Sequence, residues 1–280
     1  KAAPRASRPL NFGLKNSQIR ALKIIGADFT GYHLVPVRAL TSELRPFVAG
    51  VEDPTVPPPF LALEPDPETV GSWWHQKLGV QAAWEHATGK DVTIADCDAG
   101  YHVGETDLGN LLLDHAFDTA DRDAPTKVDD GGFVGHGTSV VAIMSGVLDG
   151  QGVSGIAPHS KVVPLQNFNY DSRIDDIGKE EATAACVLRA LTIPEVRIIV
   201  LENQTTNGSS ETFAGTREAV RLALRAGVTI VSAAGNYYRE LTEEAADDTG
   251  SIIVGALESD GTRASFSNHG SRVAIAAYGR

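Results

Sequence analysis

One histidine in this sequence stands where acid–base chemistry is favoured. His136 lies between Gly135 and Gly137 in the segment GFVGHGTSVVAIMSGV, at the start of an apolar, helix-like run. An imidazole exchanges protons near neutral pH, and a helix N-terminus favours its neutral form, which is the form that acts as a base. The flanking glycines let the backbone approach closely and leave room for a substrate chain. We therefore predict that His136 is a general base.

A carboxylate that could orient this ring precedes it in the chain. The apolar segment VTIAD, residues 92–96, ends at Asp96, and His136 follows 40 residues later. A carboxylate beside an imidazole fixes its tautomer and stabilises the cation that forms when the ring takes up a proton. We predict that Asp96 has this role.

The segments that must position these residues alternate between strand and helix from about residue 90. Short, nearly continuous β-branched runs separated by helices indicate an α/β fold with a doubly wound parallel sheet, whose ligands lie beyond the carboxyl ends of the strands. Asp96, Glu202 and Gly235 fall at such ends. The expected strands are 92–96, 161–165, 197–202, 228–235 and 251–256, and the expected helices begin near His136 and cover about 179–192 and 211–226.

The N-terminal part of the chain has a different composition. The proline-rich stretch VEDPTVPPPFLALEPDPETV, residues 51–70, is typical of an extended linker, which places a boundary near residue 60. We expect residues 1–60 to form a small α+β domain with little core of its own, and residues 61–280 to form the main domain.

Composition limits the classes of partner. The formal charge of −12 and the pI near 5.1 disfavour nucleic acid and anionic membranes as partners. No apolar run approaches the roughly 18 residues of a membrane span. The chain begins with Lys1, so we expect a processed or trimmed product. The two cysteines, Cys97 and Cys186, are too few for a disulfide framework, and we expect both to be small buried hydrophobic residues.

The chain contains four ordered blocks that together cover about residues 75–280: VTIADCDAGYHVGETDL, GHGTSVVAIMSGVLDGQGVSGIAPHSKV, TIVSAAGN and SIIVGALESDGTRASFSNHGS. These blocks resemble the subtilisin-like serine peptidases. By that resemblance Asp96 orients the ring, His136 is the general base and acid, and Asn236 donates its side-chain amide to the oxyanion. In subtilisin a donor of this kind contributes about 10²- to 10³-fold to turnover.

The resemblance implies a serine endopeptidase that acts on polypeptides, and this chain departs from the family pattern at three points. The first block reads Asp96-Cys97-Asp98 where the family usually has Asp, a small residue and Gly, and we expect Asp98 to be structural. The substrate-lining strand reads VLENQTTNG, which places Glu202 and Asn203 near the bound peptide, together with Gly235 of AAGN.

A third departure concerns the nucleophile. In the family the serine lies in a Gly-Thr-Ser motif some tens of residues beyond the last matched block, and this sequence stops at Arg280. We expect the serine to lie beyond residue 280, either on a separate chain produced by cleavage after Arg280 or on a segment removed by truncation. The 280 residues alone would then be inactive. Ser139, Ser265 and Ser267 belong to other motifs and are not expected to be the nucleophile.

The resemblance also implies accessory features. Residues 1–60 match an inhibitory prodomain of a secreted zymogen, which favours an extracellular or periplasmic location; a mere structural extension is the alternative. Asp107 and the loop LDGQGV, residues 148–153, correspond to positions where relatives bind calcium through oxygen ligands. Because the loop is short and poor in carboxylates, we expect a structural turn there and no required cofactor.

Two rival interpretations use the same residues. Asp96 and Asp98 after an apolar strand fit a magnesium-dependent phosphatase of the haloacid dehalogenase type, with the first as nucleophile and the second as proton donor. That hypothesis leaves the GHGTSVV and AAGN segments unexplained. The other rival is a catalytically inactive subtilase-like scaffold that binds a peptide or a partner. Against this hypothesis, a scaffold that does not catalyse has no physical requirement for Asp96, His136 and Asn236 together.

Overall fold

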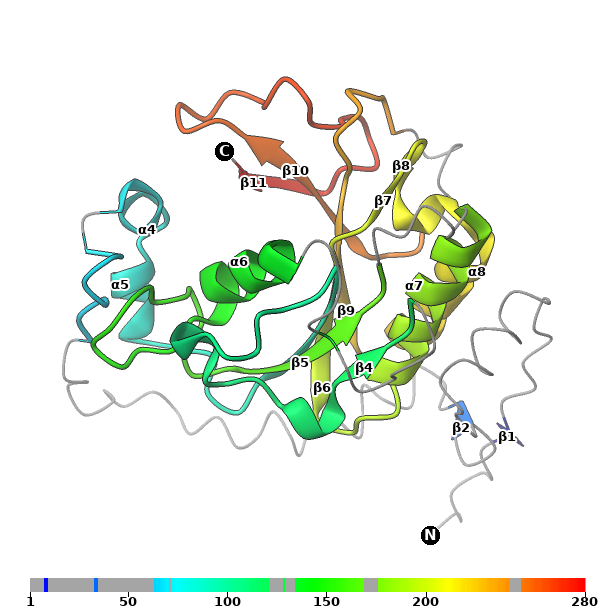
Figure 1. The fold of residues 1–280 in the computed structure, drawn as a ribbon. Coiled ribbons are helices and arrows are strands. Elements are labelled where there is room, and N and C mark those ends of the chain that lie inside the picture. Colours follow the sequence, from blue (N-terminus) through cyan, green and yellow to red (C-terminus); the bar gives the residue numbers. More distant parts are fainter. Residues whose placement is uncertain are drawn as a thin grey trace, which may run out of the picture.

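The structure is a computed structural model that describes residues 8–9, 33–34, 63–70, 72–120, 128, 134–168, 176–241 and 248–279 (Figure 1). Of the expected N-terminal domain, residues 1–60, it describes only the antiparallel pair β1 (Arg8–Pro9) and β2 (His33–Leu34). The boundary near residue 60 lies outside the described residues. Both the domain and the boundary therefore stay predictions.

A seven-stranded sheet forms the centre of the described region (Figure 1). Its order is β11-β10-β9-β6-β3-β5-β4, and every neighbouring pair is parallel. The predicted parallel α/β sheet is confirmed, including its five predicted strands. The strands are β3 (Thr93–Asp98), β4 (Phe117–Asp118), β5 (Lys161–Gln166), β6 (Val196–Leu201), β9 (Thr229–Ala233), β10 (Ile252–Leu257) and β11 (Ile275–Tyr278).

Helices cover both faces of this sheet, as expected for a doubly wound fold. Helix α6 (Val134–Ser145) packs on one face, and helices α7 (Asp176–Ala190) and α8 (Ala214–Arg225) pack side by side on the other (Figure 1). Among the described residues no helix is long and apolar enough to cross a membrane. The shorter elements are α4 (Trp73–Leu78), α5 (Val80–Trp84), the 3₁₀ turns Thr106–Leu108, Leu113–His115 and Ser210–Thr212, and the hairpin of β7 (Gln204–Thr205) and β8 (Gly208–Ser209).

The alternation of side chains along the strands decides which face each residue meets. Strand β3 is buried at all six positions. Its residues Ala95 and Cys97 join the core cluster beneath α7 and α8, which contains Cys186 of α7. Both cysteines are fully buried and free, so their expected burial is confirmed. Because the side-chain period of a strand is two, Asp96 and Asp98 must face the opposite side, where α6 lies.

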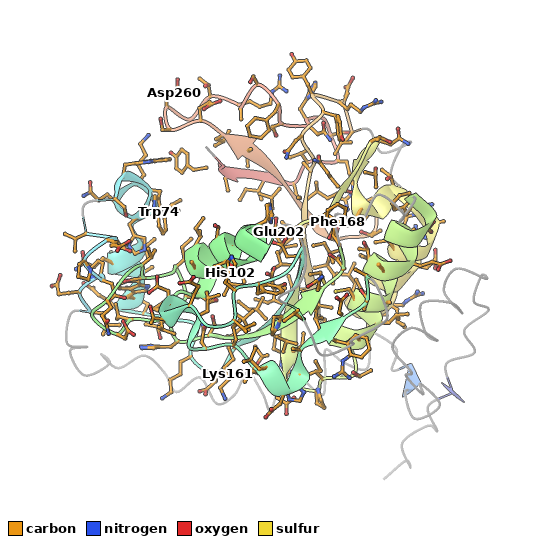
Figure 2. All side chains as sticks on the ribbon, in the orientation of Figure 1. Trp74, His102, Lys161, Phe168, Glu202 and Asp260 are labelled. Atoms are coloured by element: carbon orange, nitrogen blue, oxygen red, sulfur yellow. The ribbon has the colours of Figure 1, made fainter. Side chains whose placement is uncertain are left out.

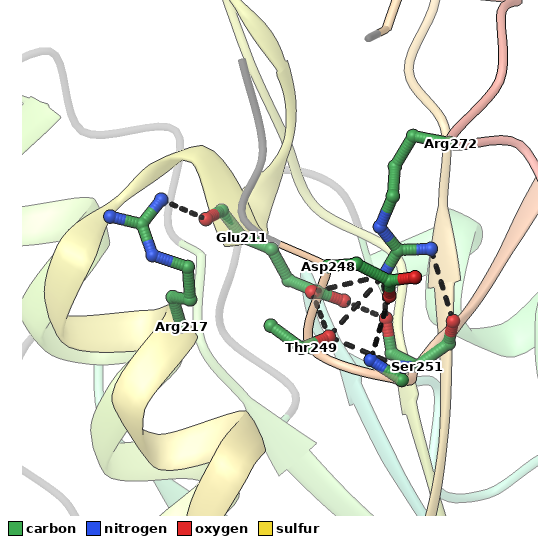
Figure 3. A network of polar contacts seen from close by, with 7 residues as sticks. Glu211, Arg217, Asp248, Thr249, Ser251 and Arg272 are labelled. Atoms are coloured by element: carbon green, nitrogen blue, oxygen red, sulfur yellow. Dashed lines mark hydrogen bonds and ion pairs between the residues drawn. The ribbon is translucent and has the colours of Figure 1, made fainter. Parts of the chain in front are cut away.

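A buried ion-pair network fixes the 3₁₀ turn beside the sheet (Figure 3). Glu211 of this turn is 1% exposed and lies 3.6 Å from Arg272, which is 5% exposed. Thr249 donates to the Glu211 carboxylate at 2.6 Å, Ser251 also donates to it, and Arg272 donates to the Ser251 carbonyl at 3.2 Å. Asp248 completes the set at 3.5 Å from Arg272. The network anchors the turn to the segments before and after β10.

Candidate active site

A histidine–aspartate pair lies at the carboxyl edge of the sheet. Asp98 is the last residue of β3 and is 2% exposed, whereas His136 lies in the first turn of α6 with half of its side chain exposed. His136 Nδ1 lies 2.8 Å from each carboxylate oxygen of Asp98. The Ala99 amide also donates to the Asp98 carboxylate. The contact between His136 and Asp98 is short enough for a charge-assisted hydrogen bond, which fixes the plane of the imidazole ring.

The carboxylate that meets His136 is therefore Asp98 and not Asp96. The sequence expectation that Asp96 contacts the ring is wrong, as is the expectation that Asp98 is merely structural at this point. Asp96 is fully buried, and neither of its carboxylate oxygens has a hydrogen-bond partner among the described residues. Both residues face α6, but Asp96 lies two positions back along β3, about 7 Å from the sheet edge where α6 begins.

Charges in the site shift the proton affinities of three groups. The hydrogen bond to Asp98 raises the pKa of His136 despite the opposing effect of burial. The helix N-terminus was expected to lower the pKa of His136 and keep the ring neutral, but the effect of the Asp98 carboxylate on this pKa is larger. Burial, reinforced by the Asp98 charge, raises the pKa of Glu202 to about 7. Burial and the charges of Asp98 and Glu202 raise the pKa of Asp96 well above its usual range, which favours its neutral form.

Only one of the two flanking glycines is needed for close approach. A Cβ on Gly137 would lie 2.5 Å from the Gly100 carbonyl oxygen and 2.8 Å from a ring carbon of Tyr101, so α6 touches the loop after β3 at this point. A Cβ on Gly135 would meet nothing within 4 Å, and this position is exposed. Gly137 thus lets the helix bring His136 to Asp98. The space at Gly135 is open.

A cavity of about 370 Å³ opens beside the pair. Its lining includes Asp98, His136, and the predicted substrate-binding residues Glu202 and Asn203, which follow directly after β6. Figure 2 shows Glu202 and Phe168, another lining residue, near one another at this edge of the sheet. The site occupies the point where the strand order reverses around β3, which is where open α/β sheets bind ligands.

The other two predicted site residues lie in the loop after β9. Gly235 and Asn236 line a second cavity of about 250 Å³, which shares Glu202 with the first. Gly235 has a φ of +97°, and a Cβ there would lie 2.7 Å from Nδ2 of Asn268. The Asn236 backbone amide donates to Oε1 of Gln204, and the Asn236 residue is exposed. The site therefore brings Asn236 near Glu202 without a direct contact between Asn236 and His136.

Sequence reasoning missed the residue that holds this loop. Asn268 is 1% exposed, and its Nδ2 donates to the Ala234 carbonyl at 2.7 Å. Its Oδ1 accepts from the amides of Tyr237 at 3.1 Å and Arg239 at 2.7 Å. One buried side-chain amide thus satisfies backbone groups on both sides of Asn236. Asn268 lies in the segment SFSNHGS, but an asparagine in this segment gave no sequence signal of this role.

Comparison with known proteins agrees with this arrangement. The model of the subtilase family matches residues 89–280. The chain belongs to the subtilase family. This match decides against the dehalogenase-type phosphatase.

Several individual subtilases resemble this chain. Thermitase of Thermoactinomyces vulgaris is 28% identical over 208 residues, which are 73% of this chain and 68% of thermitase. Fervidolysin of Fervidobacterium pennivorans is 27% identical over 214 residues, 74% of this chain but 30% of fervidolysin. A solved protease of Pseudoalteromonas arctica PAMC 21717 has a TM-score of 0.63 at 24% identity and covers 76% of this chain and 71% of that one. The matched part of the chain thus spans less than a third of fervidolysin. The similarity to the Pseudoalteromonas protease, at 24% identity, shows that the two chains share a fold.

No described serine of this subtilase reaches the ring of His136. Ser139 donates to the Gly135 carbonyl at 2.8 Å, one turn back in α6. Ser267 is buried and donates to the Asn268 carbonyl at 2.9 Å, and Ser265 is exposed in the same segment. None of these three serines is placed to lose its proton to His136. This agrees with the sequence analysis, which did not expect any of them to be the nucleophile.

The positions that correspond to calcium ligands in relatives are occupied partly by internal hydrogen bonds. Oδ2 of Asp107 accepts from the Val153 amide at 3.2 Å, and Oδ1 of Asp107 is buried without a partner among the described residues. A lone free carboxylate oxygen suits a hard cation, but Ca²⁺ takes six to eight oxygen ligands. Whether the loop 148–153 is a turn or a calcium site stays a prediction.

Proposed function

We propose that this chain is part of a serine endopeptidase, in which Asp98 and His136 act with a serine on a segment beyond residue 280. The observation that carries the proposal is the pair itself. Nδ1 of His136 is held at 2.8 Å by a buried carboxylate, while half of the side chain stays exposed beside a cavity. Among the described residues nothing bonds to Nε2, so this nitrogen is open to a hydroxyl and a substrate.

The reaction would follow from this geometry. His136 takes the serine proton through Nε2 as the serine oxygen attacks the peptide carbonyl carbon, and the carbonyl electrons move to its oxygen. Asp98 stabilises the resulting imidazolium, and the Asn236 amide stabilises the oxyanion. His136 then passes its proton to the leaving amine, and water hydrolyses the acyl-enzyme by the same steps. Proton transfer of this kind contributes about 10²- to 10⁴-fold.

The remaining sequence expectations belong to the same proposal. The serine would reach the site either on a separate C-terminal chain of the same precursor or on a continuous one. Residues 1–60 would act as the prodomain of a zymogen, and the protein would work in an extracellular or periplasmic setting on polypeptide substrates. Membership of the subtilase family supports each of these as a proposal.

The test uses the complete protein that contains these residues. A fluorophosphonate, which marks activated serines, is added before intact-mass analysis under denaturing conditions. We expect a single label, on a separate polypeptide if the chain is cleaved after Arg280. His136→Ala should abolish both labelling and peptide hydrolysis, whereas His86→Ala, at an exposed position away from the site, should change neither.

Two results would contradict the proposal. Wild-type peptidase rates in His136→Ala would remove the assigned base. Absence of label from the folded complete protein, together with retained peptide binding, would favour the inactive scaffold.

A further inference from the structure

The larger cavity beside His136 has the composition of a site for a cation. Acidic and aromatic residues line it, and no lysine or arginine occurs among the described residues of its wall. At about 370 Å³ it lies within the range of about 300–1,000 Å³ typical of ligand pockets. The described lining residues other than His136 are Asp98, Ala99, Phe168, Thr183, Glu202, Asn203, Gln204, Thr205, Ser210, Phe213 and Tyr237.

Of the two carboxylates among the described lining residues, Glu202 is the one that lacks a hydrogen-bond donor. The other carboxylate, Asp98, already accepts from His136 and from the Ala99 amide. The Glu202 side chain is largely buried, and among the described residues nothing donates a hydrogen bond to it. A buried carboxylate without a donor is costly when ionised, and a bound cation with N–H groups would remove that cost.

The aromatic rings favour the same kind of ligand. Phe168, Phe213 and Tyr237 are three aromatic residues that line the cavity. The face of an aromatic ring carries partial negative charge, so it attracts an ammonium or a guanidinium group. Arginine in particular combines a flat group that stacks on rings with a fork of donors that matches a carboxylate. An acidic ligand would instead meet two carboxylates.

We propose that this cavity binds an arginine or lysine side chain of the polypeptide substrate, with Glu202 as its counter-ion. The inference rests on the proposed peptidase function, because His136 lines the same cavity and thereby places the bound side chain close to the scissile bond. Glu202 is then a specificity-determining residue. It selects among polypeptides and takes no part in the proton transfers.

Proton binding to Glu202 makes the preference for a basic substrate side chain depend on pH. The groups that face Glu202 are Asp96 and Asp98 on β3 and His136 on α6. Burial and the charge of Asp98 raise the pKa of Glu202 to about 7, and His136 opposes the rise. Below that pH the cavity holds a neutral Glu202, and above it a carboxylate. A bound cation favours the ionised form, so binding near pH 7 releases a proton.

The test compares peptides that differ in one group. Pairs with arginine or citrulline at one position near the cut have the same shape and differ in charge. We expect the complete protein to prefer arginine in kcat/KM at one such position, more at pH 8 than at pH 6. Glu202→Gln should reduce the preference about tenfold or more, since a charged hydrogen bond is lost. Glu195→Gln, at an exposed position before β6, is the matched control and should leave it unchanged.

Calorimetry separates this inference from the proposed peptidase function. If the protein cleaves neither peptide, binding of the same pairs to it still measures the cavity. Tighter binding of the arginine peptide, with proton release at pH 7 that Glu202→Gln abolishes, would support the inference even without cleavage. Equal binding and equal kcat/KM of the two peptides would overturn it. A Glu202→Gln variant slowed equally on both peptides would also overturn it, because Glu202 would then act on catalysis or structure.

Discussion

Replacing Asp98 by asparagine tests which carboxylate serves His136. The substitution keeps the shape of the side chain and removes its charge, 2.8 Å from Nδ1. At an effective dielectric constant of about 20, Coulomb's law gives about 6 kcal/mol for unit charges at this distance, which is an upper bound. Because the His136 side chain is half exposed, solvent screens the pair, and a net value of about 1.5–3 kcal/mol for a charged hydrogen bond applies.

This free energy sets the expected loss of rate. The imidazolium forms in the transition state. Losing about 1.5–3 kcal/mol of its stabilisation by the Asp98 charge therefore slows hydrolysis by about 10- to 150-fold. An asparagine amide can also donate to Nδ1, which fixes the wrong tautomer, and in a serine protease that error costs about 10⁴-fold in kcat. We expect a decrease of about 10²- to 10⁴-fold in Asp98→Asn, with a lowered pKa of His136.

Asp96→Asn is the matched control. Burial and the charges of Asp98 and Glu202 raise the pKa of Asp96 and favour its neutral carboxylic acid, which asparagine closely resembles. We expect less than about a tenfold change in rate. Hydrolysis of a chromogenic peptide by the complete protein measures the rates, and NMR titration of the His136 ring in the 280-residue chain measures its pKa. Full activity in Asp98→Asn, or an equal loss in Asp96→Asn, would refute the reasoning.

Two further predictions concern stability. The pKa of Glu202 rises from 4.5 to about 7 on folding, so its contribution is fully present below pH 4.5 and is lost as the pH rises through 7. Glu202→Gln should therefore match the wild type in urea unfolding near pH 4 and exceed it by up to about 3 kcal/mol at pH 8; equal stability at both pH values would contradict the buried placement. Arg272→Met leaves Glu211 buried without its cation, and we expect a loss of about 3–5 kcal/mol by denaturant unfolding at pH 7. The double variant with Glu211→Gln should recover part of that loss, and an additive effect would argue against the pair.

The order of the elements followed from local sequence patterns. The strands at 92–96 and 161–165 are short β-branched runs that only burial on both faces explains, and this pattern indicated the parallel sheet. Two strands escaped the pattern. β4 is two residues long, and β11 at the sheet edge, with the sequence IAAY, has little of the β-branched character of the others. Both depend on a neighbour in the sheet for their backbone hydrogen bonds.

For the site, the sequence by itself determined that His136 opens a helix next to a strand that ends in carboxylates, because residue type and periodicity are local properties. The tertiary structure decided which carboxylate the ring meets. Asp96 and Asp98 share one face of β3, and only the crossing of α6 over the sheet edge, at the Gly137 contact, selects Asp98. Asn268 was hidden for the same reason, since its three backbone partners come from a segment about 30 residues away in the chain.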